Sequence, residues 1–378
     1  MRLATAPTAE AADIVLDLDA GHWARQGRVA FDIELTDDVI TSADLIAGFM
    51  HRGAEKLFEV RDYRQGMALA NRHDWLAPVG GEILLARAAE ELLGMPVPRQ
   101  GRLLRLLLLE LSRAAAMLAF LGPAAAPCQM PAANLVRPQT AAAREEILEL
   151  LEQLTGARMH VTFTVVGGVR DDASVEWLTS VIETCERLQS DVASTLAEAV
   201  TSDAVAAVCA GLGVVPQATA MGHGASGVVG RASGIAVDLR HDDPDYAELQ
   251  HLLPTGVASS GDTQSRLEWM AAELRSALAL SVELAQWVSH ATDRAVNQTL
   301  PKVLRVPVGS TLQWLETPLG AAGVLLESRG DRVPYRYALR TPSFAHAPLL
   351  AGALVGHRVA DAPAIVSSFP IVVGDLDK

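Results

Sequence analysis

The chain has 378 residues, of which half are apolar and a fifth are charged, and its mean hydropathy is +0.21. This composition excludes an intrinsically disordered chain, which needs low hydrophobicity and high net charge. Asp and Glu outnumber Lys and Arg by 45 to 31, giving a net charge of −14. Nucleic acid is therefore not an expected partner, because its phosphates would be repelled by most of the surface.

The first expected element is a small β-hairpin within residues 1–40. Apolar residues alternate or run together at 14–18 and 29–35, around a turn-like segment from Gly21 to Gly27. Residues 1–20 contain Arg2 and then acids, without the apolar run of a signal peptide, so none is expected.

Residues 41–300 are expected to form a helical bundle, because a 3.6-residue apolar period begins near Ser42 and continues to about His290. The most apolar stretch, 102–121, has six leucines among the seven residues 103–109. It also has four charges, Arg102, Arg105, Glu110 and Arg113, which fall within an arc of roughly 140° at 100° per residue. Charges at this density are costly in lipid, so the stretch is predicted to be a core helix that does not cross a membrane.

Residues 301–378 return to β-like runs at 311–316, 323–327 and 335–339, separated by turn signals, and end in an apolar tail expected to pack into the core. The predicted fold class is α+β, mainly α, with a central helical bundle flanked by small β elements from the two ends of the chain.

Three local motifs do not support a site of their own. Gly222–Gly227 matches G-x-G-x-x-G, but no strand is predicted before it, so a nucleotide site is not expected. His51 and Glu55 stand four residues apart, where a surface hydrogen bond within a helix is expected more than a metal site. The three cysteines, Cys128, Cys185 and Cys209, form no C-x-x-C pair and no zinc or iron–sulfur spacing. No metal site is predicted.

Ordered blocks along residues 20–378 resemble the 49-kilodalton-type subunit family of respiratory complex I, which is related to nickel–iron hydrogenase large subunits. The blocks are residues 48–57, 72–75, 89–94, 155–160, 167–169, 233–235, 238–240, 261–266, 316–320, 334–336, 342–346 and 374–378. No single block identifies the family, but a dozen blocks in the same order as in the family make the resemblance specific.

The resemblance implies a hydrogenase large-subunit-like fold and a subunit of an NADH-quinone oxidoreductase, an electron-transport complex that binds NAD and quinone. The subunit would form the quinone cavity against a small iron–sulfur partner, near membrane-arm subunits, on the cytoplasmic side of the cell membrane. The two C-x-x-C pairs that hold nickel and iron in hydrogenases are missing, so no nickel–iron centre is expected.

The quinone-cavity positions that the resemblance implies are His22, Gln26 and Trp75. Gln26 stands where the family has a histidine, and Trp75 where it has a tyrosine. Neither glutamine nor tryptophan can deliver a proton near pH 7, so protons for a reduced quinone would come from elsewhere. His22 could partly replace the lost histidine.

Two further positions, Arg52 and His160, match family residues that face the partner's iron–sulfur cluster. The alternatives are purely structural roles: a salt bridge to a neighbouring acid for Arg52, and a hydrogen-bonded position in the core for His160. Two more departures are Val165, where the family has a basic residue, and the segment 122–128, where the family has an acidic loop.

The function expected is therefore that of a quinone-cavity subunit in a complex I-like enzyme. The alternative is an assembly or structural paralogue that has lost quinone chemistry, which the replacements at Gln26, Trp75 and Val165 favour. A freestanding enzyme is the weakest option, because the chain supplies no redox centre of its own.

Overall fold

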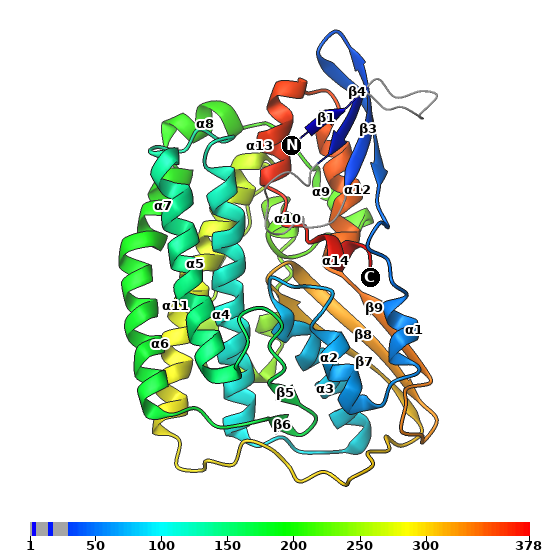
Figure 1. The fold of residues 1–378 in the computed structure, drawn as a ribbon. Coiled ribbons are helices and arrows are strands. Elements are labelled where there is room, and N and C mark those ends of the chain that lie inside the picture. Colours follow the sequence, from blue (N-terminus) through cyan, green and yellow to red (C-terminus); the bar gives the residue numbers. More distant parts are fainter. Residues whose placement is uncertain (1, 5–13, 18–28) are drawn as a thin grey trace.

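The computed structural model describes residues 2–4, 14–17 and 29–378 (Figure 1). Four antiparallel strands form an N-terminal sheet in chain order: β1 (Arg2–Ala4), β2 (Ile14–Asp17), β3 (Ala30–Thr36) and β4 (Val39–Ile46). The predicted pairing of the segments near residues 14 and 30 is confirmed. Residues 42–46, expected to be helical, instead complete β4, because they pair with β3 along its length.

The helical bundle is built from long helices that Figure 1 shows on one side of the molecule. They are α4 (Arg99–Ala124), α5 (Ala133–Thr155), α6 (Val175–Leu188), α7 (Ser194–Val200) and α11 (Thr263–His290), with a π-helical turn, Gln189–Ala193, joining α6 to α7. Helix α4 packs against α11, α5 and α3 (Pro78–Leu93) and is buried along most of its length, which confirms the predicted core helix.

The charged arc of α4 also lies mostly inside the protein. Arg105 pairs with Glu90 at 2.5 Å, and Arg113 pairs with Glu110 at 3.0 Å, all four being buried. Neighbouring elements surround α4, so these charges are neutralised by ion pairs and not by water.

The C-terminal sheet confirms the three predicted runs. Strands β7 (Gly309–Thr317), β8 (Gly320–Ser328) and β9 (Arg336–Arg340) are antiparallel in chain order, and α3 packs on β7 and β8. The tail is buried but helical: α12 (Pro342–Leu354), α13 (Ala362–Ser367) and α14 (Val373–Leu376). The backbone of Ile40 exchanges hydrogen bonds with Gly356 and His357, which ties the N-terminal sheet to this tail.

Short elements complete the fold. They are α1 (Ala54–Phe58), α2 (Tyr63–Ala70), β5 (Thr164–Val165), β6 (Gly168–Val169), α8 (Asp203–Cys209), α9 (Gln217–Gly222), α10 (Gly227–Ala232) and the 3₁₀ turns Leu239–His241, Pro244–Tyr246, Gln250–Leu252 and Val359–Asp361. Ser202 caps α8 by accepting a hydrogen bond from the backbone N–H of Val205, as serine often does at a helix N-terminus. The Gly222–Gly227 motif follows helix α9 and not a strand, so it lacks the context of a dinucleotide site.

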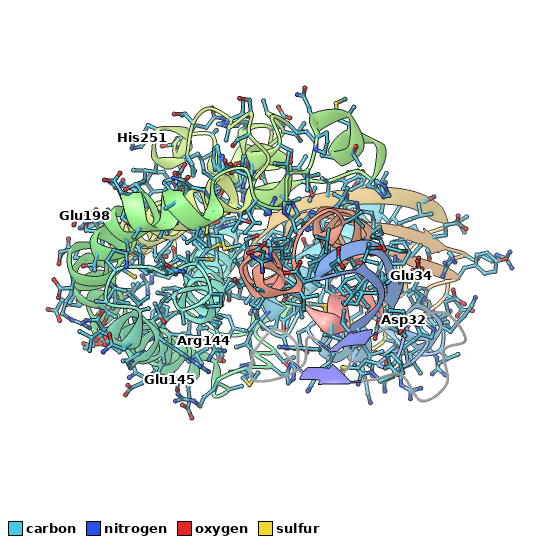
Figure 2. The ribbon with its side chains drawn as sticks, turned by 90° about the horizontal axis from the view of Figure 1, so that it is seen from above. Asp32, Glu34, Arg144, Glu145, Glu198 and His251 are labelled. Carbon is cyan, nitrogen blue, oxygen red and sulfur yellow. The ribbon has the colours of Figure 1, made fainter. Side chains whose placement is uncertain are left out.

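Viewed from above, the N-terminal sheet carries Asp32 and Glu34 across the molecule from Glu198 on α7 (Figure 2). No single helix in the described ranges has the length and apolar composition of a membrane span, although the bent pair Val175–Val200 and Asp203–Cys209 meets that criterion by length and composition.

Candidate functional site

A pocket of about 100 Å³ lies where the segment before α1 meets the end of α2 and the C-terminal α14. Its walls are partly apolar and partly basic. The lining residues are Met50, Arg52, Ala54, Leu57, Phe58, Leu69, Arg72, His73, Gly374, Asp377 and Lys378. Segments from opposite ends of the sequence therefore build one site.

The C-terminal residues fix the wall formed by residues 48–51. The buried Asp377 carboxylate accepts hydrogen bonds from the backbone N–H groups of Gly48 (2.7 Å) and Met50 (2.9 Å). His51 Nδ1 lies 2.5 Å from the Lys378 carbonyl oxygen, so this nitrogen is a donor. The predicted hydrogen bond between His51 and Glu55 is wrong, because α1 begins at Ala54 and His51 turns to the tail instead.

Glu55 connects α1 to β9. Its carboxylate accepts from the backbone N–H of Leu339 at 2.8 Å and from Arg336 at 2.5 Å. Burial would raise the pKa of Glu55, but these donors outweigh it and the pKa is lowered. The ionised Glu55 carboxylate therefore has a structural role, because it ties α1 to β9 beside the pocket.

Arg52, Arg72 and His160 form a basic face at the mouth of this pocket. Arg52 is exposed, and no carboxylate forms an ion pair with it within the described part of the chain, so the salt-bridge alternative gains no support there. Burial, together with the nearby Arg72 and Arg52 cations, lowers the pKa of His160, although its contact with the Asn71 backbone opposes this. Arg52 and Arg72 both line the pocket, and His160 contacts the backbone of Asn71, the residue before Arg72, so the three residues share one region.

A buried polar chain runs from His160 into the core. His160 Nδ1 lies 3.2 Å from the carbonyl oxygen of Asn71, and Asn71 Nδ2 donates to Glu82 Oε1 at 2.8 Å. Glu82 also accepts from the backbone N–H of Thr164 at 3.0 Å. Burial raises the pKa of Glu82 to about 7 despite these donors. Since a carbonyl can only accept, the contact fixes Nδ1 as the protonated nitrogen of neutral His160.

Trp75 is half-buried and packs on the pocket wall without lining it. A Cβ added to Gly374 would stand 2.4 Å from Trp75 Cζ3, so the indole lies directly against the backbone of that glycine. Glycine at position 374 is therefore what allows an indole here.

Two acids and a histidine are buried beside Trp75. Burial raises the pKa of Asp74 to about 7, and the neighbouring Asp375 adds to the rise. Burial also raises the pKa of Asp375, while His73 opposes that change. Burial lowers the pKa of His73 itself. Near pH 7 the Asp74–Asp375 pair holds a proton that a surface aspartate would have released.

Of the predicted site residues, the structure brings Arg52, His160 and Trp75 to one region, and His22 and Gln26 lie outside the described residues. Arg72, His73, Asp377 and Lys378 were not singled out from the sequence, although they belong to the blocks 72–75 and 374–378. The resemblance of both blocks to one family was the only sequence signal that they belong to one site.

The chain is similar to proteins of known families along most of its length. The family model described as respiratory-chain NADH dehydrogenase, 49 Kd subunit, matches residues 138–303 and 295–378. A D-type NADH-quinone oxidoreductase subunit of Streptomyces coelicolor is 39% identical, with 98% of this chain and 96% of the relative covered. The D-type subunits of Salinispora arenicola and Campylobacter concisus are 40% and 31% identical, each with 97% of this chain and 94% of the relative covered.

Among solved structures, a chain of the membrane-bound sulfane sulfur reductase, an archaeal respiratory membrane complex, has a TM-score of 0.87 and 30% identity, with 96% of this chain and 98% of that chain covered. The fold and the site thus define a helix-bundle subunit of the hydrogenase-related class found in respiratory membrane complexes. Within that class, the chain belongs to the 49-kilodalton subunit family of the respiratory-chain NADH dehydrogenase, which is complex I.

Proposed function

We propose that this chain forms the acceptor cavity of a complex I-like NADH-quinone oxidoreductase, with quinone as the substrate. The observation that carries the proposal is the pocket beside the basic face, built by residues 48–58, Arg72, His160 and the C-terminal tail. We place the subunit on the cytoplasmic side of the membrane, next to membrane-arm subunits.

The basic face is proposed to meet a small iron–sulfur partner. Phe49, three residues before Arg52, is 53% exposed, and Met159, next to His160, is 43% exposed. Exposed apolar residues next to a pocket are typical of an interface. The cation of Arg52 would favour the reduced form of a nearby cluster, and His160 could change protonation with its redox state.

The cluster itself is assigned to the partner. The chain has three cysteines, on separate elements and all buried, whereas a cluster of this kind needs four closely placed thiolates. No group of three His, Cys, Asp or Glu side chains suited to a metal occurs among the residues described. The cluster would supply electrons, and this chain would position the acceptor and protonate the product.

The proton source is proposed to be the Asp74–Asp375 pair with His73. Trp75 has no ionisable proton near pH 7, but its neighbour Asp74 is buried with a raised pKa. His73 lines the pocket, and its charge acts on Asp375, so we assign His73 to pass a proton from the two acids to the acceptor. General-acid help of this kind contributes about 10²–10⁴-fold to a rate.

A photo-crosslinking amino acid at position 52 tests the partner surface, with the same residue at position 198 as the control. Glu198 is exposed on α7, which lies across the molecule from α1 (Figure 1). We expect position 52 to capture a small iron–sulfur subunit in membranes and position 198 to capture none. Equal capture at the two positions, or none at position 52, would contradict the proposal.

A non-catalytic assembly paralogue is the second candidate, favoured by Trp75 in place of a tyrosine. A related fold also occurs in a sulfane sulfur reductase, so the acceptor itself needs testing. Membranes containing this chain, or lacking it, can be assayed with a short-chain quinone and with polysulfide. Quinone reduction that falls when Trp75 is replaced by alanine, or when His22 is substituted, would exclude the non-catalytic candidate. Activity with polysulfide alone would replace quinone as the substrate.

A further inference from the structure

Buried polar contacts join α2, α3 and the segment that carries His160. Asn71 is the C-cap residue of α2 and Glu82 lies in α3, and both side chains are fully buried. Asn71 Nδ2 donates to Glu82 Oε1 at 2.8 Å and to the carbonyl oxygen of Val161 at 2.5 Å. The residue that follows His160 is therefore tied to α2 directly and to α3 through Asn71.

These contacts fix the orientation of the Asn71 amide. A backbone carbonyl can only accept a hydrogen bond, so the amide atom that faces Val161 is the nitrogen and not the oxygen. The same nitrogen meets the Glu82 carboxylate, which also accepts. With the amide turned by half a rotation, its oxygen would face two acceptors, so a single orientation satisfies both neighbours.

Glu82 also holds the His160 segment by its second oxygen. Oε2 accepts from the backbone N–H groups of Phe163 at 3.3 Å and of Thr164 at 3.0 Å. Hydrogen bonds to a charged acceptor are stronger than those between neutral groups, and a buried site strengthens them further. Glu82 therefore fixes both the side chain of Asn71 and the backbone that follows His160.

His160 completes this arrangement through its ring. Nδ1 lies 3.2 Å from the backbone carbonyl oxygen of Asn71, so Nδ1 carries the proton of the neutral ring. Nε2 then keeps its lone pair, and no hydrogen bond to Nε2 occurs among the residues that the structure describes. Because the His160 side chain is only half-buried, Nε2 is the ring nitrogen left to bind a proton or a donor.

We propose that Glu82 and Asn71 are positioning residues that hold His160 in its Nδ1-protonated form and leave Nε2 as the acceptor. Glu82 acts on His160 through Asn71 and through the backbone of residues 161–164. This role rests on the proposed function and deepens it, because a redox-linked proton at the basic face would bind at Nε2. The tautomer itself is a property of this chain and is measured without a partner or an acceptor.

Nitrogen-15 NMR of the full-length chain with labelled histidine rings measures the tautomer. At about pH 8 the imidazole is neutral, and the chemical shifts of its two nitrogens show which one carries the proton. The chain has ten histidines, so the variant His160→Gln identifies the signal. We expect wild-type His160 to be predominantly Nδ1-protonated. A predominantly Nε2-protonated ring would overturn the proposal, and this measurement needs no variant to fold.

Glu82→Gln and Asn71→Ala should each convert the His160 signal to a mixture of the two tautomers. Glutamine has one acceptor oxygen where the carboxylate has two, so it cannot serve both Asn71 and the backbone donors. Asn71→Ala removes the link but leaves the backbone carbonyl. Glu82→Asp, one methylene too short to reach both sides, is the second variant if Glu82→Gln does not fold. Retention of the wild-type tautomer in a folded variant at either position would overturn the proposal.

Glu90→Gln is the matched control. Glu90 is buried on the same helix and accepts from the backbone N–H of Gly167 at 2.7 Å and from Arg105. In the described part of the chain it forms no hydrogen bond with Asn71 or with residues 160–164, so Glu90→Gln should keep the Nδ1-protonated ring. An equal change of tautomer in Glu90→Gln would overturn the specific role of Glu82. Crosslinking at position 52 tests the partner separately, so the two outcomes are distinguishable.

Discussion

Asp377 Oδ1 accepts a 2.7 Å hydrogen bond from the backbone N–H of Gly48, which lies 329 positions earlier in the chain. The same carboxylate accepts from Met50 through its second oxygen. The C-terminal tail therefore acts as the frame of the pocket, because it holds the segment that carries Arg52 in place. Changes in the tail should disturb the site without touching any residue of the basic face.

Asp377→Ala should destabilise the protein by about 1–3 kcal/mol, since two backbone N–H groups lose a charged acceptor. The free energy of unfolding in urea measures this. Asp331→Ala is the control, because Asp331 is exposed. Its ion pair with the exposed Arg305 is worth about 0–1 kcal/mol, and its hydrogen bond from the backbone N–H of Arg332 is local and also exposed. Equal losses in the two variants would show that Asp377 does not anchor the pocket segment.

Glu82 gives a pH prediction. Its folded-state pKa of about 7 exceeds its ordinary value of 4.5, so the folded protein binds more protons between these values and stability falls as pH rises from about 4.5 to 7. The loss is on the order of 3 kcal/mol for a shift of this size. Glu82→Gln should remove this part of the pH dependence.

The free energy of unfolding is measured for the wild type and for Glu82→Gln at several pH values. The contributions of the other titrating groups cancel in the difference between the two proteins. Glu198→Gln, an exposed change on α7, should leave the slope unaltered. A constant difference between wild type and Glu82→Gln from pH 4.5 to 7 would refute the raised pKa.

Trp75→Tyr should restore a phenolic proton donor beside the pocket. If the cavity reduces quinone, we expect at least a tenfold higher quinone-reductase rate in membranes, approaching the range of about 10²–10⁴-fold typical of general-acid catalysis. Trp75→Phe leaves an aromatic ring without the hydroxyl and should give no increase. A similar rate in both variants would show that a phenol at position 75 cannot donate a proton to the acceptor.

The buried ion cluster around Glu273 predicts a large stability effect. Glu273 accepts from Arg240 at 2.8 Å and from Arg231, and Arg113 lies 3.9 Å away. Glu273→Gln leaves three buried cations short of an anion and should cost about 3–5 kcal/mol. Thermal and urea unfolding measure the loss, and the exposed Glu149→Gln on α5 should be nearly neutral. A loss below about 1 kcal/mol for Glu273→Gln would contradict the expectation.

The spacing of apolar residues and turn signals along the sequence predicted much of the fold. It predicted few of the contacts that build the site. The strands β7, β8 and β9 were predictable because alternating side chains stand between clear turn signals. Residues 42–46 were predicted to be helical and are part of a strand. A short apolar run fits the 3.6-residue period of a helix and the two-residue period of a strand equally well until its partner strand is known.

The charged partners of α4 could not be predicted, since Arg113 is neutralised in part by Glu273, 160 positions later in the chain. The same holds for Asp74 and Asp375: burial raises both pKa values, and Asp375 adds to the rise at Asp74, 301 positions earlier. Only the resemblance of the two blocks to one family indicated that these segments act together.

Affinity purification of this chain from membranes, followed by mass spectrometry and electron paramagnetic resonance of the reduced sample, tests the proposed role most directly. We predict recovery of a small iron–sulfur subunit and membrane-arm subunits in stoichiometric amounts, with a cluster signal that depends on Arg52. Recovery of the chain alone, without an iron–sulfur subunit or a cluster signal, would contradict its role as the cavity-forming subunit.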